Sequence, residues 1–313
     1  MIGAIDIGGT KTITAVLSES GEIIISKQFP TVSNNWQEHF KITADHFREC
    51  AGDHIDSLAG VGINVPGMTD HNRGILIYAP HQNWRNVPVR EYFREALSID
   101  NIKVENDVNS CAIGEMVFGG GGTDFIWITI STGNGGAIVA NSELIRGVNH
   151  CAGEFGHLKV EYENPRRCSC GQWGCLESQS SGTAIKAIFH EKLACDNELL
   201  KLVKETEKEN PEFKRDAYGL GILAEGGSDT ALEIFRTAGK YLGRAISYGL
   251  NISNPERVYL GGGVSKALQL MLPEIYKEIE KNTVPEAKTV EILETKLGYN
   301  AALLGAGALI LIN

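Results

Sequence analysis

The chain has 313 residues, a formal net charge of −10 and 42% hydrophobic residues. At roughly 100–200 residues per domain, this length predicts two domains with well-developed cores. The excess of acidic residues argues against binding of nucleic acid or of an anionic membrane surface, because both depend on clustered Lys and Arg.

The ends of the chain predict a cytoplasmic protein. The first residues, MIGAID, lack the basic segment and the long apolar segment of a secretory signal. The longest nearly apolar stretch, 301–312, contains two glycines and falls short of the roughly 20 residues that cross a bilayer. In the cytoplasm thiols stay reduced, so clustered cysteines predict a metal or catalytic site rather than disulfides.

Strand-like and helix-like segments alternate along the chain. Residues 2–29 alternate β-branched and small residues around glycines, which predicts strands joined by tight turns. Before the glycine run 119–122 we predict a helix at 36–49, a strand at 59–68, a turn-rich loop at 69–85, a helix at 89–97, a strand at 102–104 and a helix from 108. After 125–145, which repeats the pattern of 2–29, we predict a Cys/His loop at 150–175, helices over 183–250, a strand, glycine turn and helix start at 255–266, a strand at 290–292 and an apolar helix at 301–312. This alternation predicts an α/β protein.

The repeated strand pattern suggests that the two domains are related. Two meanders, each entered through a turn rich in Thr and Gly, lie far apart in the chain. Two unrelated hairpins that both need glycine at positive φ are the alternative. We place a small α/β domain at 1–118, completed by a C-terminal helix at 300–313. The large α/β domain, 119–299, contains the Cys/His loop, and the glycine run 119–122 is the candidate linker.

Three glycine-rich turns follow strand-like segments. The first is Asp6-Ile7-Gly8-Gly9-Thr10-Lys11. Glycines let backbone N–H groups approach a phosphate, Thr and Lys add donors, and an acid beside phosphates is tolerable mainly with a divalent cation between them. One such turn alone is as readily an ordinary hairpin. The second turn, 132–136, and the third, 261–263, favour a nucleotide-phosphate site.

A Cys/His cluster predicts a metal centre. One imidazole and three thiolates occur within a short stretch, at His157, Cys168, Cys170 and Cys175. This is a ligand set that Zn²⁺ takes in closed structural sites, and four protein ligands leave no open position for a catalytic water. We therefore expect a structural zinc ion, with four unrelated loop residues as the alternative. The four scattered cysteines are expected to be small buried hydrophobes.

Together these motifs resemble the ROK family of bacterial sugar kinases and related repressors, within the actin-like ATPase superfamily. The resemblance covers nearly the whole chain, in the order Asp6–Thr12, Val65–Gly67, Glu105–Asp107, Thr132–Gly136, Glu154–His157, the cysteine cluster ending in Glu177, and Gly261–Gly263. It implies two RNase H-like domains with a nucleotide and sugar cleft between them, and ATP-dependent phosphorylation of the 6-hydroxyl of a hexose. Glucose is the first expectation, with N-acetylmannosamine, another N-acetylhexosamine or fructose as alternatives. A homodimer is also implied.

The resemblance implies roles for individual residues. Asp107 is the expected catalytic base, although an aspartate at a helix start is otherwise usually an N-cap. ATP and Mg²⁺ would be held by residues of the three glycine turns, namely Asp6, Gly8, Gly9, Thr10, Lys11, Thr12, Thr132, Gly133, Gly135, Gly136, Gly262 and Gly263. The sugar would contact Gly67, Asn106, Asp107, Glu154, His157 and Glu177. Without the resemblance, Glu177 would be interpreted as a solvated acid at a helix start.

Several positions depart from the family pattern. In the second glycine turn, Ser131, Asn134 and Ala137 stand where Gly, Ile and Gly are common. In the sugar-side loop 79–84, His81 stands where Asn is frequent, which leaves the identity of the sugar open. A repressor of the family would carry a helix-turn-helix domain ahead of the sugar-binding part. Because the first glycine turn already begins at Asp6, we expect a kinase.

Overall fold

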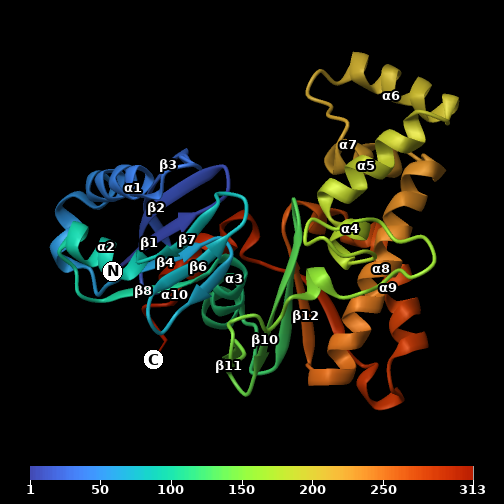
Figure 1. The fold of residues 1–313 in the computed structure, drawn as a ribbon. Coiled ribbons are helices and arrows are strands. Elements are labelled where there is room, and N and C mark those ends of the chain that lie inside the picture. The colour runs from blue at the N-terminus through green and yellow to red at the C-terminus, as the bar shows by residue number, and fades with distance from the viewer. Residues whose placement is uncertain (313) are drawn as a thin grey trace. The chain divides into compact units, whose positions relative to one another are not determined.

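The computed structural model describes residues 1–312, which group into two compact units, each drawn in Figure 1. Unit 1 contains 1–123, 141–152 and the residues from 295 onward, and unit 2 contains 124–140 and 153–294. The predicted domain boundaries lie a few residues from two of these breaks. Segment 141–152, however, groups with unit 1 and not with the predicted domain 119–299, because its side chains are anchored to unit 1, as described below. Asn313, the last residue of the predicted helix 300–313, lies outside the described residues.

The first sheet, in unit 1, has the strand order β3-β2-β1-β4-β8. Its strands are β1 (Ile2–Ile7), β2 (Lys11–Leu17), β3 (Ile23–Pro30), β4 (Val61–Val65) and β8 (Ile102–Asn106). β1 pairs antiparallel with β2, whereas β1, β4 and β8 are parallel to one another. The carboxyl ends of these three parallel strands therefore meet at one edge of the sheet.

Helices pack on both faces of the first sheet. Along β1, Ile5 and Ile7 share a core with residues of α1 (Trp36–Ala51) and α2 (Val89–Leu97). Ile2 and Ala4 share a second core with residues of α10 (Ala301–Ala308), which also packs against α3 (Asp107–Gly114). Alternate side chains of a strand point to opposite faces, so the alternation in 2–7 assigns one helix pair to each face. A π-helical turn, Glu115–Gly119, continues α3, and short 3₁₀ turns occur at Gly52–Ser57 and Gly298–Asn300.

The segment predicted as a turn-rich loop, 69–85, contains a small antiparallel sheet. Its strands are β5 (Met68–Asp70), β6 (Ile75–Ala79) and β7 (Trp84–Val87), in the order β5-β6-β7. The prediction was wrong here because turn residues interrupt these strands, whose buried side chains are few: Thr69, Leu76, Ala79, Trp84 and Val87. Tertiary burial, which the turn residues conceal in the sequence, stabilises the small sheet.

Unit 2 repeats the arrangement of unit 1. Its strands β9 (Phe125–Ile130), β10 (Asn134–Ala140), β12 (Arg257–Gly261) and β13 (Glu291–Glu294) have the order β10-β9-β12-β13. β9 and β10 form an antiparallel hairpin, while β9, β12 and β13 are parallel. The strands β2-β1-β4-β8 of unit 1 follow the same plan, which confirms the predicted internal repeat. A short strand, β11 (Glu143–Ile145), follows β10 where the third strand of the repeat was predicted.

The helices of unit 2 form one extended core with its sheet. They are α4 (Leu176–Ser180), α5 (Gly182–Leu193), α6 (Asn197–Glu209), α7 (Ala217–Glu225), α8 (Asp229–Ser253) and α9 (Leu268–Asn282), with 3₁₀ turns at Phe155–His157, Gly263–Ala267 and Pro285–Ala287. Helices α8 and α9 lie side by side in Figure 1 and pack closely. Over residues 1–312, no helix combines the length and the apolar character that a bilayer span requires.

Candidate active site

In unit 1, three predicted site segments meet at the carboxyl edge of the first sheet. Asp6 lies near the end of β1, in register with Asn64 of β4, and Asn106 ends β8. Asn64 Nδ2 donates to Asp6 Oδ1 at 3.4 Å and to the carbonyl of Ala302 at 2.5 Å. Burial raises the pKa of Asp6, and the hydrogen bond from Asn64 and the charge of Lys11 oppose this rise. Ligands of open α/β sheets bind at this kind of edge.

Asp107 begins helix α3 at the same edge. Its Oδ1 accepts hydrogen bonds from Asn106 Nδ2 and from its neighbour's backbone, Val108 N, both at 2.9 Å. Burial and the nearby charge of Asp6 raise the pKa of Asp107 to about 6. A carboxylate with that pKa is ionised near neutrality and still basic enough to take a proton from a hydroxyl group that is losing it.

Asn106 caps α3 and holds Asp107. Its Oδ1 accepts from the backbone N–H groups of Val108 and Asn109, at 2.9 and 3.0 Å. Its Nδ2 donates to Asp107 and to the carbonyl of Gly67, the latter at 3.0 Å. An asparagine amide offers two donors and accepts two bonds, so this side chain is fully used. The N-cap is therefore Asn106 and not Asp107, and a sugar contact by Asn106 would have to share one of these bonds.

A buried ion pair supports this corner from behind. Glu105 is 1% exposed and accepts from Arg146 Nε at 2.7 Å with one oxygen. Its other oxygen accepts from the backbone of Asn106 and from Asn109 Nδ2, at 3.0 and 3.1 Å. Because Arg146 lies in the segment 141–152, this pair is one reason why that segment belongs to unit 1. A second is His150, whose Nε2 lies 3.8 Å from Asp70 Oδ1.

The first glycine turn closes tightly between β1 and β2. Gly8 N donates to the carbonyl of Lys11 at 2.9 Å, and Gly9 and Thr10 are exposed at the tip. Lys11 Nζ lies 3.8 Å from the centre of the Tyr299 ring and hydrogen-bonds the Tyr299 hydroxyl. The ammonium group is therefore held at the turn by a residue from the far end of the chain.

The nucleotide contact predicted for Thr12 stays a prediction, and its side chain faces the core rather than the tip of the glycine turn. It is fully buried and hydrogen-bonds Thr31 Oγ1 and His39 Nε2, both at 2.9 Å. In strand β2 successive side chains alternate in direction, so the residue after Lys11 points into the core. Burial lowers the pKa of His39 to about 4, which keeps this imidazole neutral at physiological pH.

In unit 2, the second and third glycine turns lie together. The second turn is short, with Ser131 N donating to the carbonyl of Gly133 at 2.9 Å and Thr132 exposed. Gly262 has φ +87°, and a Cβ there would lie 2.4 Å from the carbonyl of Ile130, the residue before this turn. The start of α5 joins them, since Gly182 N donates to the carbonyl of Ser131 at 2.8 Å. Gly263 follows Gly262 at the start of a 3₁₀ turn.

Gly135 and Gly136 lie within β10 rather than in the turn. Gly135 pairs with Thr129 and Gly136 with Ile128 of β9. A Cβ on Gly136 would lie 2.5 Å from the Phe155 ring, so packing alone accounts for this glycine. The phosphate contacts that the sequence predicts for Gly135 and Gly136 stay predictions.

Three predicted sugar residues gather beside the second glycine turn. Glu177, in the first turn of α4, accepts from the backbone N of Asn134 at 3.3 Å. The pKa of Glu154 is raised by removal of its carboxylate from water and by the charge of Glu177, and His157 opposes this rise. The charges of Glu177 and His157 therefore both act on the carboxylate of Glu154.

The predicted ligand cluster is assembled in unit 2. The candidate ligand atoms of His157, Cys168, Cys170 and Cys175 all lie within 4.8 Å of one another. Cys170 and Cys175 Sγ are 3.8 Å apart, and Cys168 Sγ is 3.7 Å from His157 Nδ1. Tetrahedral sites with bonds of about 2.0–2.3 Å have ligand separations of about 3.3–3.8 Å. The four atoms thus form a possible metal site.

Nothing in the sequence singled out the side chains of Gln82, Lys159 and Ser169 as parts of a site. Gln82 is 3% exposed, its Nε2 lies 3.7 Å from a Cβ built on Gly9, and neither of its amide atoms has a hydrogen-bond partner among the described residues. Lys159 Nζ donates to Cys175 Sγ at 3.2 Å and to the carbonyl of Trp173 at 2.8 Å. Ser169 lies between two cysteines and donates to Glu177. The burial of Gln82 and the contacts of Lys159 with Cys175 and of Ser169 with Glu177 identify these residues, and all of these depend on the fold.

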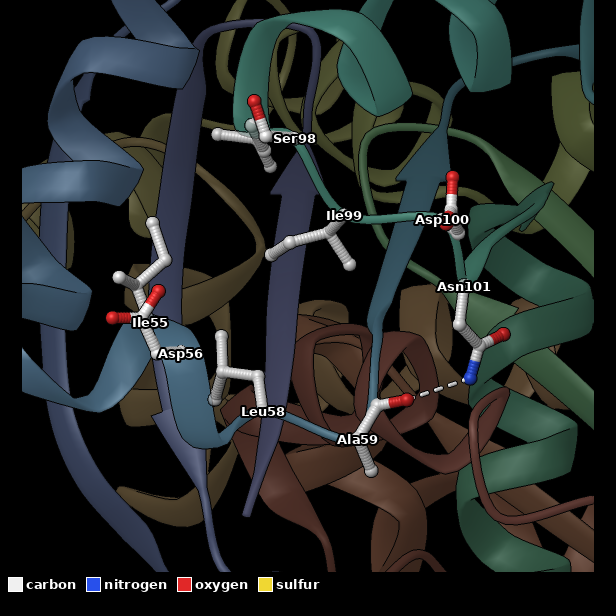
Figure 2. Close-up of a pocket in the computed structure, with 9 residues that line it drawn as sticks. Ile55, Asp56, Leu58, Ala59, Ser98, Ile99, Asp100 and Asn101 are labelled. Atoms are coloured by element: carbon white, nitrogen blue, oxygen red, sulfur yellow. Dashed lines mark hydrogen bonds between the residues drawn. The ribbon is translucent and has the colours of Figure 1, made fainter.

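A cavity of about 360 Å³ lies elsewhere in unit 1 (Figure 2). Leu58 and Ala59 line it before β4 begins, and Asp100 and Asn101 line it before β8 begins. Asn101 Nδ2 donates to the carbonyl of Ala59 at 2.8 Å, which closes one side. The cavity is thus at the amino ends of these strands, whereas Gly67 and Asp107 follow their carboxyl ends. It does not coincide with the predicted site.

Comparisons with known proteins agree with this geometry. A family model described as the ROK family matches residues 2–312. A glucokinase of Halalkalibacterium halodurans is 33% identical and is matched over 98% of this chain and 93% of its own length. A xylose repressor of Bacillus spizizenii is 31% identical, matched over 97% of this chain and 75% of its own length. The solved structure of a ROK family glucokinase from Streptomyces griseus, in complex with glucose and AMPPNP, has a TM-score of 0.82 at 26% identity and covers 98% of each chain.

The ion pair behind Asp107 gives a stability prediction. Arg146→Met removes the partner of the buried Glu105 carboxylate, and we expect a loss of about 3 kcal/mol in the free energy of unfolding, because an uncompensated buried charge is costly. Urea unfolding followed by circular dichroism measures it. Adding Glu105→Gln should recover part of the loss, since the buried charge is then gone. The control is Arg94→Met, which breaks an exposed pair with Glu91 and should change little. Equal effects of the two arginine variants would contradict the prediction.

Proposed function

The chain belongs to the ROK family, and on that premise we propose that it is an ATP-dependent kinase that phosphorylates the 6-hydroxyl of a hexose, with glucose as the first substrate to test. The observation that carries the proposal is Asp107, whose pKa is about 6, held at the carboxyl edge of the first sheet beside Asp6 and the first glycine turn. The glucokinase relative and the glucokinase structure with glucose and AMPPNP support the same activity.

Asp107 would act as the base. Both of its side-chain hydrogen bonds end on Oδ1, and Oδ2 is the oxygen that we expect to accept the proton. As the sugar oxygen loses that proton, it forms a bond to the γ-phosphorus of ATP, the bond from this phosphorus to the bridging oxygen breaks, and ADP leaves with the electron pair. Such transfers need positioning and charge neutralisation more than covalent help. Asn106 supplies positioning, because it fixes Asp107 Oδ1.

Magnesium fits the edge that holds Asp6 and Asp107. The two carboxylates repel each other, as the raised pKa of Asp107 indicates, and Asn64 Oδ1 is buried with no hydrogen-bond partner among the described residues. Carboxylate and amide oxygens are the ligands that Mg²⁺ prefers. When bound, Mg²⁺ would neutralise charge on the phosphate oxygens. We assign Asp6 to the ion, and the three glycine turns and Lys11 to the phosphates.

Zinc fits the Cys/His cluster. Three thiolates and a neutral imidazole around Zn²⁺ carry one net negative charge, and Cys175 is fully buried. The Lys159 ammonium, which donates to Cys175 Sγ, offsets that charge. Groups outside the ligand set commonly tune a metal site in this way. We infer a closed structural site that holds Glu154, His157 and Glu177 in place for the hydroxyl groups of the sugar.

A sugar-responsive regulator is the second candidate function. The xylose repressor, matched over nearly all of this chain, favours it. A regulator has no need of a base, so the environment of Asp107 weighs toward the kinase.

A coupled assay for ADP release decides between these functions. Glucose, mannose, fructose, N-acetylglucosamine and N-acetylmannosamine would each be tested with ATP and Mg²⁺, and we expect turnover with at least one of them. Sugar binding by calorimetry without any turnover would establish the regulator instead.

Protonation of Asp107 should determine how the activity falls at acidic pH. A base whose pKa is raised to about 6 is protonated below that pH, so kcat/KM for the sugar should fall with a slope of one below pH about 6 and level off above it. Asp107→Asn should lower kcat by about 10²–10⁴-fold while sugar still binds. Initial rates across pH and calorimetry measure both. A variant that keeps more than about a tenth of kcat would exclude Asp107 as the base.

Lys159 should increase the affinity of the cluster for zinc. Lys159→Met keeps the length of the side chain but removes its charge and its hydrogen bond to Cys175, so we expect zinc affinity to fall about tenfold. Zinc transfer to a chromogenic chelator, with the metal content determined by mass spectrometry, measures this. Lys208→Met, at an exposed position of α6, is the control. Identical transfer curves for the two variants would rule out the assigned role of Lys159.

A further inference from the structure

We propose that Ser169 is a positioning residue for Glu177, and that through Glu177 the Cys/His loop sets the geometry of the second glycine turn. The proposal rests on the proposed function for its kinetic consequence, and its structural part stands without that function. Ser169, Glu177 and the turn 131–134 all belong to unit 2.

The two oxygens of Glu177 face two different loops. Oε1 accepts from Ser169 Oγ at 2.7 Å and lies 3.6 Å from Cys168 Sγ. Oε2 accepts from the backbone N of Asn134 at 3.3 Å, at the end of the glycine turn. One carboxylate therefore joins the residue between Cys168 and Cys170 to the first residue of β10.

The surroundings leave Glu177 little freedom. A Cβ on Gly133 would lie 2.4 Å from Glu177 Oε2, so only glycine lets the carboxylate approach the turn. Helix α4 also fixes the side chain of Asn134, whose Nδ2 donates to Ser180 Oγ at 2.8 Å. Glu177 and Ser180 thus attach the same helix to the same turn, and α4 begins directly after Cys175.

The Ser169 hydroxyl decides where this carboxylate points. A glutamate side chain has several rotatable bonds. The hydrogen bond from Asn134 N is long and holds only one of the two carboxylate oxygens. The short bond from Ser169 holds the other oxygen, and hydrogen bonds to a charged group are among the stronger ones. The charge of Glu177 also raises the pKa of Glu154. Loss of the hydroxyl should therefore disturb the turn and the pair of carboxylates that we assign to the sugar.

Ser169→Ala tests the proposal, with Ser178→Ala as the matched control. Ser178 lies on α4, and its Oγ bonds the carbonyls of Arg166 and Cys175, at 3.1 and 2.9 Å, not Glu177. We expect Ser169→Ala to raise KM for the sugar about tenfold with kcat within about twofold of the parent, and Ser169→Thr to restore KM because it keeps a hydroxyl. The bound metal, measured by mass spectrometry, should be unchanged in all three variants.

Two further measurements separate this proposal from the proposed function. Hydrogen exchange of a peptide covering 131–140 should quicken in Ser169→Ala and not in Ser178→Ala, whether or not the protein phosphorylates a sugar. A double-mutant cycle on KM with Glu177→Gln should be non-additive, because Ser169 acts through Glu177. Unchanged exchange in 131–140 would overturn the proposal. Faster exchange with an additive cycle would overturn its kinetic part, and absence of turnover in the parent protein would count against the proposed function alone.

Discussion

The site in unit 1 depends on two carboxylates that stand close together at the end of a buried sheet. β1, β4 and β8 are parallel and in register, so Asp6, near the end of β1, and Asp107, directly after β8, lie at the same edge of the sheet, with β4 between their strands. Burial raises the pKa of both groups, and the charge of Asp6 raises that of Asp107 further. In the protein alone, holding both carboxylates in this position costs free energy. A bound cation or a group that donates a proton to a carboxylate would each lower that cost. That cost is what makes the edge suitable for a metal ion and a base.

The remaining parts of unit 1 hold these carboxylates in place. Asn64 reaches Asp6 from the next strand, and Asn106 donates one hydrogen bond to Asp107 and another to the carbonyl of Gly67. The pair of Glu105 and Arg146 then holds Asn106 through its backbone. Asn64 and Glu105 therefore have partners from other strands and loops, whereas most partners of the Asn106 amide are the residues that follow it in the chain.

Unit 2 uses the same plan of strands with different side chains at its loops. Its hairpin ends in a glycine turn that carries no carboxylate of its own, and Glu177 is brought to that turn by α4. A cluster of thiols and an imidazole fixes the start of α4, and Lys159 places a positive charge beside it. The internal repeat therefore conserves backbone topology, while the two units place their acidic groups by different means.

Much of the fold and of the candidate site could be predicted from local motifs in the sequence. The β/α alternation, the repeat, the glycine turns and the ligand set of the cluster each occupy short stretches whose spacing is set by backbone geometry. Boundaries and short strands were less accurate, as in 69–85, because turn residues are common in small sheets and their burial is decided elsewhere. Segment 141–152 was assigned to the wrong unit because Arg146 pairs with Glu105, a partner about forty positions away.

The sequence by itself determined which chemical groups this protein carries in its short motifs: Asp6, Asp107, the glycines and the Cys/His set. Only the tertiary structure decided which of those groups are exposed and which face the core. Thr10 and Thr12 belong to the same motif, yet one is exposed and the other is buried against His39, which lies in a helix 27 residues further along the chain. Burial and hydrogen-bond partners depend on segments distant in sequence, and they set the pKa of Asp107, the orientation of Asn106 and the contacts of Lys159 and Ser169.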